Sequence, residues 1–382
     1  MTRAFLACVF LLCVGNAAIA DGYRDFNLGA AASDRLDHDL AIKYLSSAIA
    51  APDLPEHLRA VAYEARAEEY YEQQKYDLAI ADYSAAIAAK SDWIDPRVGR
   101  CGAYDAQDVL DKAIADCTAA IEMQPDNWRL RLYRVHLYYE TKDFAAIVAD
   151  YSRFIAMRPD DGGLLVGRAN ALQLLGQFDK ALADADAAHE LASKWSGPFA
   201  VRGRVYFARG DFPSSADAWD SAVDRASGDA GAHLAYGQAE WAMGKFHRAS
   251  SAFEDSLDQD KDEHYAFLWL FISKSLENAK VPQDIVAHFS SMDLARWPGP
   301  LVQLYLGKTT PDALLAMKGP DPDTIDDYQC SVGFFVGEWY RMQGNAALAK
   351  QKLEAAANVC TAYTAERQYA LVALSQLPQG TP

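Results

Sequence analysis

Hydrophobic positions recur along this chain at one fixed spacing. An alanine slot and a second packing slot each return after 34 residues or a multiple of 34. Such a period is the length of a helix–turn–helix hairpin that buries its apolar side against the next copy. The pattern therefore predicts an all-α chain of stacked hairpins. The positions that carry it are Ala79, Ala113, Ala181 and Ala249 in one slot and Tyr83, Cys117, Tyr151, Ala185, Trp219 and Phe253 in the other.

The same register divides the chain into repeats. It predicts seven hairpins over residues 21–263, with a longer link after the first, and the loops between later hairpins contain proline or glycine, which stop helices. Gly176, Gly210 and Gly244 mark turns inside hairpins, where glycine can take the left-handed conformation that ends a helix. This organisation resembles the tetratricopeptide repeat, which implies a right-handed superhelical solenoid and, by default, a protein that holds other proteins.

Residues 264–382 keep the repeat only in part. The segment Tyr265–Phe271 is apolar on nearly all sides, which predicts a buried helix. Proline and glycine near 298–300 and 319–322 predict irregular connections. A regular repeat returns at about 330–360, and a last helix near 363–377 is expected to cap the array. This section is therefore predicted to be a divergent helical region that ends in a capping helix.

The first 20 residues have the features of a signal peptide. A positively charged start is followed by the apolar run Ala4–Val14 and by small residues at Ala18 and Ala20. We expect cleavage after Ala20 and export of residues 21–382, most simply to a bacterial periplasm.

The cysteines indicate two disulfides. Cys8 and Cys13 lie in the leader and leave a lipid anchor open, although neither has the sequence context that lipid attachment needs. Cys101 and Cys117 occupy two facing slots of one hairpin, and Cys330 and Cys360 lie at neighbouring ends of another. In an oxidising compartment these four are predicted to form two bridges, Cys101–Cys117 and Cys330–Cys360. The alternative is four buried thiols.

Charge and motifs limit the possible functions. With 36 Lys and Arg against 53 Asp and Glu, the net charge is −17, which disfavours nucleic acid and anionic membranes and favours neutral or basic partners. The eight histidines are scattered, and the chain has no zinc motif, glycine-rich phosphate loop or nucleophile elbow. We therefore predict no enzyme activity, no cofactor and no metal.

Charged residues repeat in the same register as the apolar ones. An arginine recurs at every repeat, and an aspartate 16 residues later accompanies the first four, which predicts ion pairs within or between hairpins, with a ligand-binding strip as the alternative. Arg202 lacks this partner because Ala218 stands there, so it is expected to be freer to bind a ligand. The predicted pairs are Arg66–Asp82, Arg100–Asp116, Arg134–Asp150 and Arg168–Asp184.

In arrays of this type, positions 2, 5, 9, 12 and 13 of each first helix line a concave groove. Position 12 is often aromatic here, and rings on a concave surface suit a bound peptide. The alternative is that these rings belong to the core. The predicted partner-binding residues are Glu68, Tyr71, Arg129, His136, Tyr139, Asn170, Arg204, Phe207, Gln238 and Trp241.

The C-terminal third resembles the NlpI-like bacterial envelope proteins. The resemblance covers about 265–377, and the residues that carry it are Tyr265 before Trp269-Leu270, Trp297-Pro298-Gly299, Tyr305-Leu306-Gly307, Phe335 with Gly337-Glu338-Trp339-Tyr340, and Glu366-Arg367 before Tyr369-Ala370-Leu371. It implies an all-helical periplasmic adaptor, often dimeric, that brings peptidoglycan hydrolases together with one another or with a processing protease. The family's best-known branch is lipid-anchored, and the lipid-attachment motif is missing here.

Two functions follow from these observations. The first is a non-catalytic exported adaptor whose groove holds a segment of another envelope protein. The second is a carbohydrate-binding module that contacts peptidoglycan through the same rings.

Overall fold

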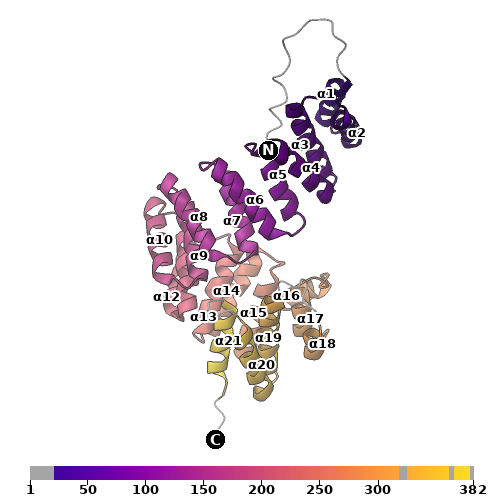
Figure 1. The fold of residues 1–382 in the computed structure, drawn as a ribbon. Coiled ribbons are helices and arrows are strands. Elements are labelled where there is room, and N and C mark those ends of the chain that lie inside the picture. The colour runs from indigo at the N-terminus through magenta and orange to yellow at the C-terminus, as the bar shows by residue number, and fades with distance from the viewer. Residues whose placement is uncertain (1–20, 318–324, 361–364, 379–382) are drawn as a thin grey trace. The chain divides into compact units, whose positions relative to one another are not determined.

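The computed structural model describes residues 21–317, 325–360 and 365–378, so the predicted leader lies outside the described residues. Every regular element in these ranges is an α-helix, which confirms the all-α class. The described residues form two compact units, the N-terminal unit up to Asp150 and the C-terminal unit from Tyr151 onward, whose helices are labelled in Figure 1.

The N-terminal unit is a row of helix hairpins. In each hairpin the first helix is helix A, the second is helix B, and a short turn joins them. The side chains of Asp37 and Asn127 cap helices by accepting hydrogen bonds from backbone N–H groups of the first turn. The hairpins are α1 (Asp21–Asp34) with α2 (His38–Ala50), α3 (Glu56–Glu72) with α4 (Tyr76–Ala89), α5 (Asp95–Asp105) with α6 (Leu110–Met123), and α7 (Trp128–Glu140) with α8 (Phe144–Met157), which crosses the unit boundary.

The C-terminal unit continues the hairpins and then departs from them. Its regular hairpins are α9 (Gly162–Leu174) with α10 (Phe178–Leu191), α11 (Gly197–Arg209) with α12 (Phe212–Arg225), and α13 (Ala230–Ala242) with α14 (Phe246–Gln259). The helices that follow are α15 (His264–Leu276), α16 (Gln283–Ser291), α17 (Gly299–Tyr305), α18 (Pro311–Leu315), the hairpin α19 (Ile325–Met342) with α20 (Ala346–Val359), and α21 (Ala365–Gln376). The hairpins form the predicted solenoid.

A left-handed residue follows helix A at the same register in hairpin after hairpin. Only some of these turns carry the glycines that the sequence predicts, and the others place a side chain where glycine is favoured. Because Asn278 keeps the register, α15 takes the place of a helix A beyond the seven predicted hairpins. The positions are Leu36, Gln74, Asp108, Lys142, Gly176, Gly210, Gly244 and Asn278.

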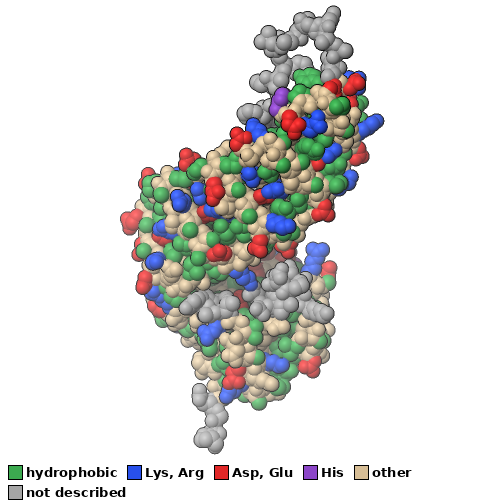
Figure 2. All heavy atoms as spheres, in the orientation of Figure 1, with side chains coloured by type: hydrophobic (Ala, Val, Ile, Leu, Met, Phe, Trp, Pro, Cys, Tyr) green, Lys and Arg blue, Asp and Glu red, His purple; other side chains and the backbone are tan. Residues whose placement is uncertain are grey.

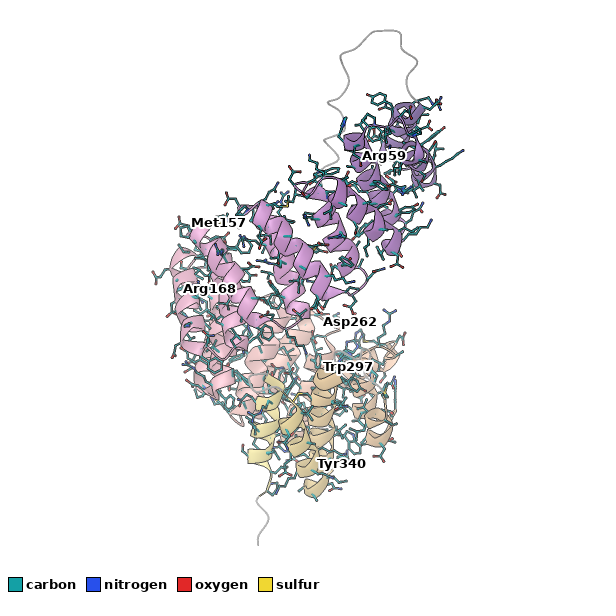
Figure 3. The ribbon with its side chains drawn as sticks, in the orientation of Figure 1. Arg59, Met157, Arg168, Asp262, Trp297 and Tyr340 are labelled. Carbon is teal, nitrogen blue, oxygen red and sulfur yellow. A yellow bond between two sulfur atoms is a disulfide. The ribbon has the colours of Figure 1, made fainter. Side chains whose placement is uncertain are left out.

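The four predicted arginine–aspartate pairs all form, and each lies within one hairpin. Each guanidinium donates through Nε and Nη2 to the two carboxylate oxygens at 2.6–3.0 Å. Nη1 donates to a serine or threonine on helix B of the preceding hairpin at 2.8–3.1 Å. One arginine, such as Arg168 in Figure 3, therefore joins its own two helices and also the neighbouring hairpin.

The expectation that Arg202 is freer to bind a ligand is wrong. Arg202 donates through Nε and Nη2 to Asp186 Oδ1 at 3.0 and 2.6 Å. Asp186 lies on α10 at the position that serine or threonine takes in the other pairs. The missing aspartate at Ala218 is thus compensated from the preceding hairpin, by a carboxylate whose side chain is 64% exposed.

Both predicted disulfides are present. Cys101 and Cys117 join α5 to α6 with a Cα–Cα distance of 5.6 Å. Cys330, near the start of α19, is bonded to Cys360, just after α20, with a Cα–Cα distance of 5.1 Å. The slots face each other in other hairpins too, because a Cβ added to Gly203 would lie 2.5 Å from Trp219 Nε1 on the partner helix.

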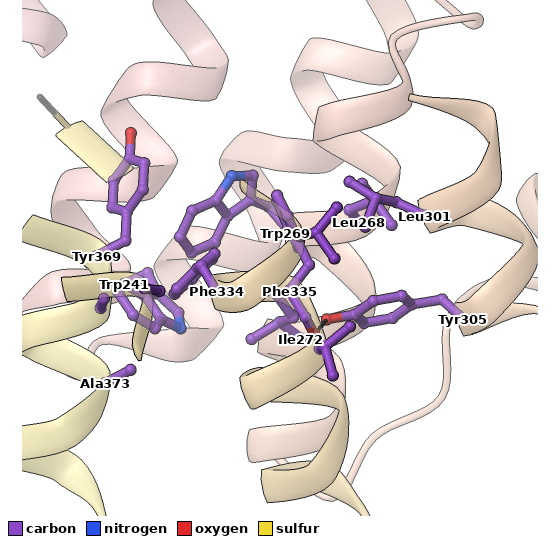
Figure 4. Packing of buried hydrophobic residues seen from close by; sticks show 14 of the residues in the cluster. Trp241, Leu268, Trp269, Ile272, Leu301, Tyr305, Phe334, Phe335, Tyr369 and Ala373 are labelled. Atoms are coloured by element: carbon purple, nitrogen blue, oxygen red, sulfur yellow. Dashed lines mark hydrogen bonds between the residues drawn. The ribbon is translucent and has the colours of Figure 1, made fainter. Parts of the chain in front are cut away.

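One core cluster rich in aromatic residues joins α11 to α21 of the C-terminal unit, and Figure 4 shows part of it. Trp269 on α15 is buried, as predicted for Tyr265–Phe271, and its ring centroid lies 5.2 Å from that of Phe334 on α19. The Tyr305 hydroxyl donates to the backbone oxygen of Phe335 at 2.8 Å. Several residues that carry the family resemblance therefore serve in packing. On the face shown in Figure 2, acidic and basic side chains are interspersed.

Candidate functional site

The ten predicted partner-binding residues all lie on a helix A. The N-terminal unit carries Glu68 and Tyr71 on α3 and Arg129, His136 and Tyr139 on α7. The C-terminal unit carries Asn170 on α9, Arg204 and Phe207 on α11, and Gln238 and Trp241 on α13.

In the C-terminal unit, the last helix lies against the helix-A side of the array. Helix α21 contacts α11, α13 and α19 in addition to its neighbour α20. The Tyr369 ring centroid lies 5.2 Å from that of Phe207 and 4.7 Å from that of Trp269. Helix α21 was predicted as a cap at the end of the array; it packs on the last hairpin, α19 with α20, and also lies against α11 and α13, on the side where the groove residues were predicted.

Polar contacts fix α21 in this place. The Tyr369 hydroxyl donates to Gln238 Oε1 at 2.6 Å, and burial raises the Tyr369 pKa well above its ordinary value, so the hydroxyl keeps its proton. Gln368 Nε2 donates to the backbone oxygen of Ala208 at 3.1 Å. Because Ala208 lies in the last turn of α11, this amide satisfies a helix-terminal carbonyl and helps to set the orientation of the docked helix.

Two predicted groove rings therefore belong to the core. The side chains of Phe207 and Trp241 are 6% and 0% exposed. Arg204 is exposed, and its Nη2 donates to Asn170 Oδ1 at 2.8 Å. Of the five predicted residues in this unit, the aromatic pair is covered by the chain itself.

The rings of the N-terminal unit lie closer to solvent. Tyr71 and Tyr139 are partly exposed, although each also contacts the ring that opens its helix B, with centroids 5.4 Å from Tyr76 and 6.5 Å from Phe144. His136 is exposed and stacks at 6.5 Å on Tyr133. The two interpretations of the position-12 rings, as core residues or as groove residues, therefore both apply here, because each ring packs on a neighbouring ring and is also partly exposed.

Arg129 lies at the edge of this surface, at the start of α7. It is exposed, and its guanidinium carbon lies 5.4 Å from the ring centroid of Trp128. This contact pairs a cation with an aromatic ring within the chain.

Acidic side chains gather on α3. Glu64, Glu68 and Glu72 follow one another at four-residue spacing, which places them on one side of the helix. Burial, together with repulsion from Glu68 and from Asp95 on α5, raises the pKa of Glu64 to about 8. Among the described residues, no lysine or arginine forms an ion pair with Glu64. The raised pKa favours the protonated, neutral form of Glu64 at neutral pH, and a cation bound close to Glu64 would favour the charged form.

Two tyrosines and an aspartate converge next to this acidic surface. The Tyr133 hydroxyl donates to Asp105 Oδ2 at 2.5 Å. A Cβ added to Gly102 would lie 3.8 Å from the hydroxyl oxygens of both Tyr71 and Tyr133. Burial, and then the hydrogen bond to Asp105, raises the Tyr133 pKa. We call Tyr71, Gly102, Asp105 and Tyr133 the Tyr71–Tyr133 site; its oxygens can accept hydrogen bonds and attract a cation.

Sequence reasoning missed most of this site, and it also missed Glu64 on the helix that carries Tyr71. Glu64 and Gly102 stand at positions 5 and 9, which the groove rule itself marks, so the rule applied to every repeat would have found them. Tyr133 stands at position 6, outside the rule, and only the structure shows that its hydroxyl reaches Asp105.

The described residues contain no group of three or more His, Cys, Asp or Glu placed to hold a metal ion. Within the same ranges, no helix is both long enough and apolar enough to cross a membrane.

Residues 201–262 match the tetratricopeptide repeat family. The 34-residue register and the hairpin fold extend the same type of repeat beyond this matched segment.

Solved structures of other repeat proteins are similar to parts of this chain. A tetratricopeptide repeat protein from Parabacteroides merdae is 15% identical, with a TM-score of 0.42 over 66% of this chain and 98% of that one. The C-terminal part of a repeat protein from Cytophaga hutchinsonii is 18% identical, with a TM-score of 0.49 over 64% and 99%. The first repeat domain of Spaghetti (RPAP3), bound to an HSP90 peptide, is 18% identical, with a TM-score of 0.30 over 33% and 97%.

Proposed function

We propose that this protein is an exported, non-catalytic adaptor that holds a segment of another protein on the helix-A side of its N-terminal unit. One observation carries the proposal: in the C-terminal unit the same side of the array holds a helix, α21, through ring and amide contacts. The N-terminal unit presents partly exposed rings, Tyr71 and Tyr139, at the matching repeat positions. Aromatic side chains give much contact area for little conformational entropy, which suits a binding surface.

The compartment and the class of partner are part of the proposal. The leader features and the two disulfides support export to an oxidising compartment. The C-terminal resemblance to NlpI-like proteins supports an envelope partner, such as a peptidoglycan hydrolase or a processing protease. The net charge of −17 favours a partner segment that is neutral or basic.

Site-specific photocrosslinking in cells tests the adaptor function. A photoreactive phenylalanine analogue at Tyr139 should form a covalent adduct with another protein, because its ring reaches solvent on the proposed surface. The matched control places the analogue at Lys350, an exposed residue of α20 in the other unit. An adduct at Tyr139 that is absent at Lys350 supports the proposal. Equal adducts at both positions, or none at Tyr139, would contradict it.

Direct binding to peptidoglycan is the second candidate. Trp128 favours it, because its side chain is 41% exposed at the start of α7 and aromatic faces are common in carbohydrate contacts. Purified protein should then sediment with isolated cell-wall sacculi, and Trp128→Ala should lower the bound fraction. No sedimentation at low salt would exclude this candidate and leave the adaptor function standing.

A further inference from the structure

The C-terminal unit shows in detail how this array holds a helix. Tyr369 of α21 contacts rings from three helices of the array: Phe207 on α11, Trp241 on α13 and Trp269 on α15. Gln238, beside these rings, accepts the hydrogen bond of the Tyr369 hydroxyl. The docked helix thus inserts one side chain between rings and satisfies its polar end there.

The 34-residue register relates these positions to the N-terminal unit. Each of these residues has a counterpart four repeats earlier in the sequence. Phe207 corresponds to Tyr71, Gln238 to Gly102, Trp241 to Asp105 and Trp269 to Tyr133. These are the four residues of the Tyr71–Tyr133 site, which the structure brings together through contacts of their own. Two independent observations therefore indicate the same residues. One is the repeat register, which relates them to the residues that hold Tyr369, and the other is the contacts within the Tyr71–Tyr133 site itself.

The residues that differ between the two sites change which partner side chain can be accommodated in the Tyr71–Tyr133 site. Gly102 has no side chain where Gln238 has an amide, and Asp105 puts a carboxylate where Trp241 has a ring. A neutral ring such as Tyr369 would cover the Asp105 carboxylate without a counter-charge, which is costly. An ammonium or guanidinium group suits the site, because the carboxylate and the phenol oxygens accept its hydrogen bonds and tyrosine rings attract cations.

The surroundings also favour a cation. Glu64 lies on α3, the helix of Tyr71, and Asp95 lies on α5, the helix of Gly102; after burial and Glu68, repulsion from Asp95 contributes to the raised pKa of Glu64. The nearest arginines of the repeat series cannot neutralise them, because Arg66 and Arg100 are each committed to a buried aspartate. A cationic side chain from a partner would lower the repulsion between these acidic residues.

We propose that the Tyr71–Tyr133 site receives a lysine or arginine side chain from a helical segment of the partner protein. This inference rests on the proposed adaptor function and names the chemistry of the segment that is held. The partner helix enters the N-terminal unit as α21 enters the C-terminal one, with a cation in place of the Tyr369 ring.

Two stapled helical peptides serve as probes. Both have the sequence of Ala365–Gln376, one unchanged and one with Tyr369→Arg, and each is titrated against the full chain by fluorescence anisotropy. We expect the arginine peptide to bind at least tenfold more tightly. Asp105→Asn in the protein should remove this preference, and Gly102→Leu should block binding by occupying the space above Gly102. Asp111→Asn, an exposed aspartate of α6, is the control that should change nothing.

Three results would overturn the inference: equal or tighter binding of the tyrosine peptide, an unchanged preference in the Asp105→Asn protein, or no binding of either peptide. Circular dichroism of each variant establishes that it is folded. The outcome can be told apart from that of the adaptor function. A crosslinked partner at Tyr139 without any preference for the arginine peptide would contradict only the inference about the Tyr71–Tyr133 site. A preference for the arginine peptide without a crosslinked partner would contradict only the adaptor function.

Discussion

The two units use the same side of the same repeat in opposite ways. In the C-terminal unit, Trp241 and Phe207 are buried beneath α21 and form part of a continuous aromatic core. In the N-terminal unit, the corresponding positions hold Asp105 and Tyr71, both partly exposed. A repeat position therefore does not decide between core and surface by itself. The decision depends on whether a later part of the chain supplies a helix to cover it, and a carboxylate at the position disfavours such a cover.

Removing the central ring of α21 should have the largest effect. Tyr369→Ala deletes a buried aromatic side chain and its hydrogen bond to Gln238, so we expect the unfolding free energy to fall by about 4 kcal/mol. Hydrogen exchange followed by mass spectrometry should show faster exchange in α11, α13 and α21 and unchanged exchange in the N-terminal unit. Tyr369→Phe, which keeps the ring, should cost about 1 kcal/mol. Unchanged exchange in α11 and α13 would mean that α21 only caps the array.

A comparison of two arginines tests whether the pairs differ in strength. Arg66→Met should lower the unfolding free energy by about 3 kcal/mol, because it leaves the buried Asp82 without its partner. Arg202→Met should cost less than about 1 kcal/mol, because the partner of Arg202, Asp186, is 64% exposed and can be solvated. Chemical denaturation of both variants measures the difference. Equal losses would show that exposure of the aspartate does not control the effect.

The sequence predicts the architecture well, because the buried residues recur at the same positions of each 34-residue repeat. The disulfide pairs and four ion pairs also follow from it, since facing slots of a hairpin stay facing in every copy. The role of α21 could not be predicted. Its contacts with Phe207 and Trp241 join residues more than 100 positions apart, and no periodic pattern encodes a contact made once.

Among the described residues, each unit contains one disulfide, and both should contribute about equally. Replacing Cys101 and Cys117 by alanine, or Cys330 and Cys360 by alanine, should lower the unfolding free energy by about 3 kcal/mol through loop entropy. Thermal unfolding with and without a reducing agent measures this. The double-alanine variants provide the control, since a reducing agent should not change their midpoint through the missing bridge. A loss confined to one unit would show that the other bridge is dispensable for its hairpin.

The acidic surface of the N-terminal unit should make its stability depend on pH. The pKa of Glu64 is raised to about 8 in the folded state by burial and by Glu68 and Asp95. Tyr83 of α4, whose own pKa burial raises, also lies near these acids. The folded state therefore holds a proton that the unfolded state releases. The stability due to Glu64 is fully present below pH 4.5 and is lost as pH rises to about 8.

Replacement of the carboxylate measures this contribution. Glu64→Gln should be more stable than the unchanged protein at pH 8 by about 2 kcal/mol, after allowance for partial solvent exposure, with little difference at pH 4.5. Glu72→Gln, an exposed glutamate of the same helix, is the control. Parallel stability curves for the protein and Glu64→Gln between pH 4.5 and 8 would contradict the prediction.

The candidate site was only partly predictable. Tyr71 could be found because position 12 is a surface slot in this repeat, whereas Trp241 satisfies the same rule and is buried. The rule for groove positions describes the surface of each helix A when no other helix, such as α21, packs on it. Tyr133 and Asp105 meet through one side-chain hydrogen bond between adjacent hairpins, which depends on the rotamer of the tyrosine and leaves no trace in the spacing.

The turns between helix A and helix B also differ between the two units, and this difference should have the smallest effect on stability. Lys142 in the N-terminal unit has φ 56°, and Gly210 in the C-terminal unit has φ 77° at the same register position. A side chain in this conformation costs about 1 kcal/mol or more, so Lys142→Gly should raise the unfolding free energy by about that amount, less the entropy that glycine adds to the unfolded chain. Gly210→Ala should lower it by about 1 kcal/mol, although nothing lies within 4 Å of the added methyl group. Chemical denaturation of the two variants gives opposite signs if backbone conformation decides. Two losses would mean that the Lys142 side chain makes contacts that outweigh its strained backbone.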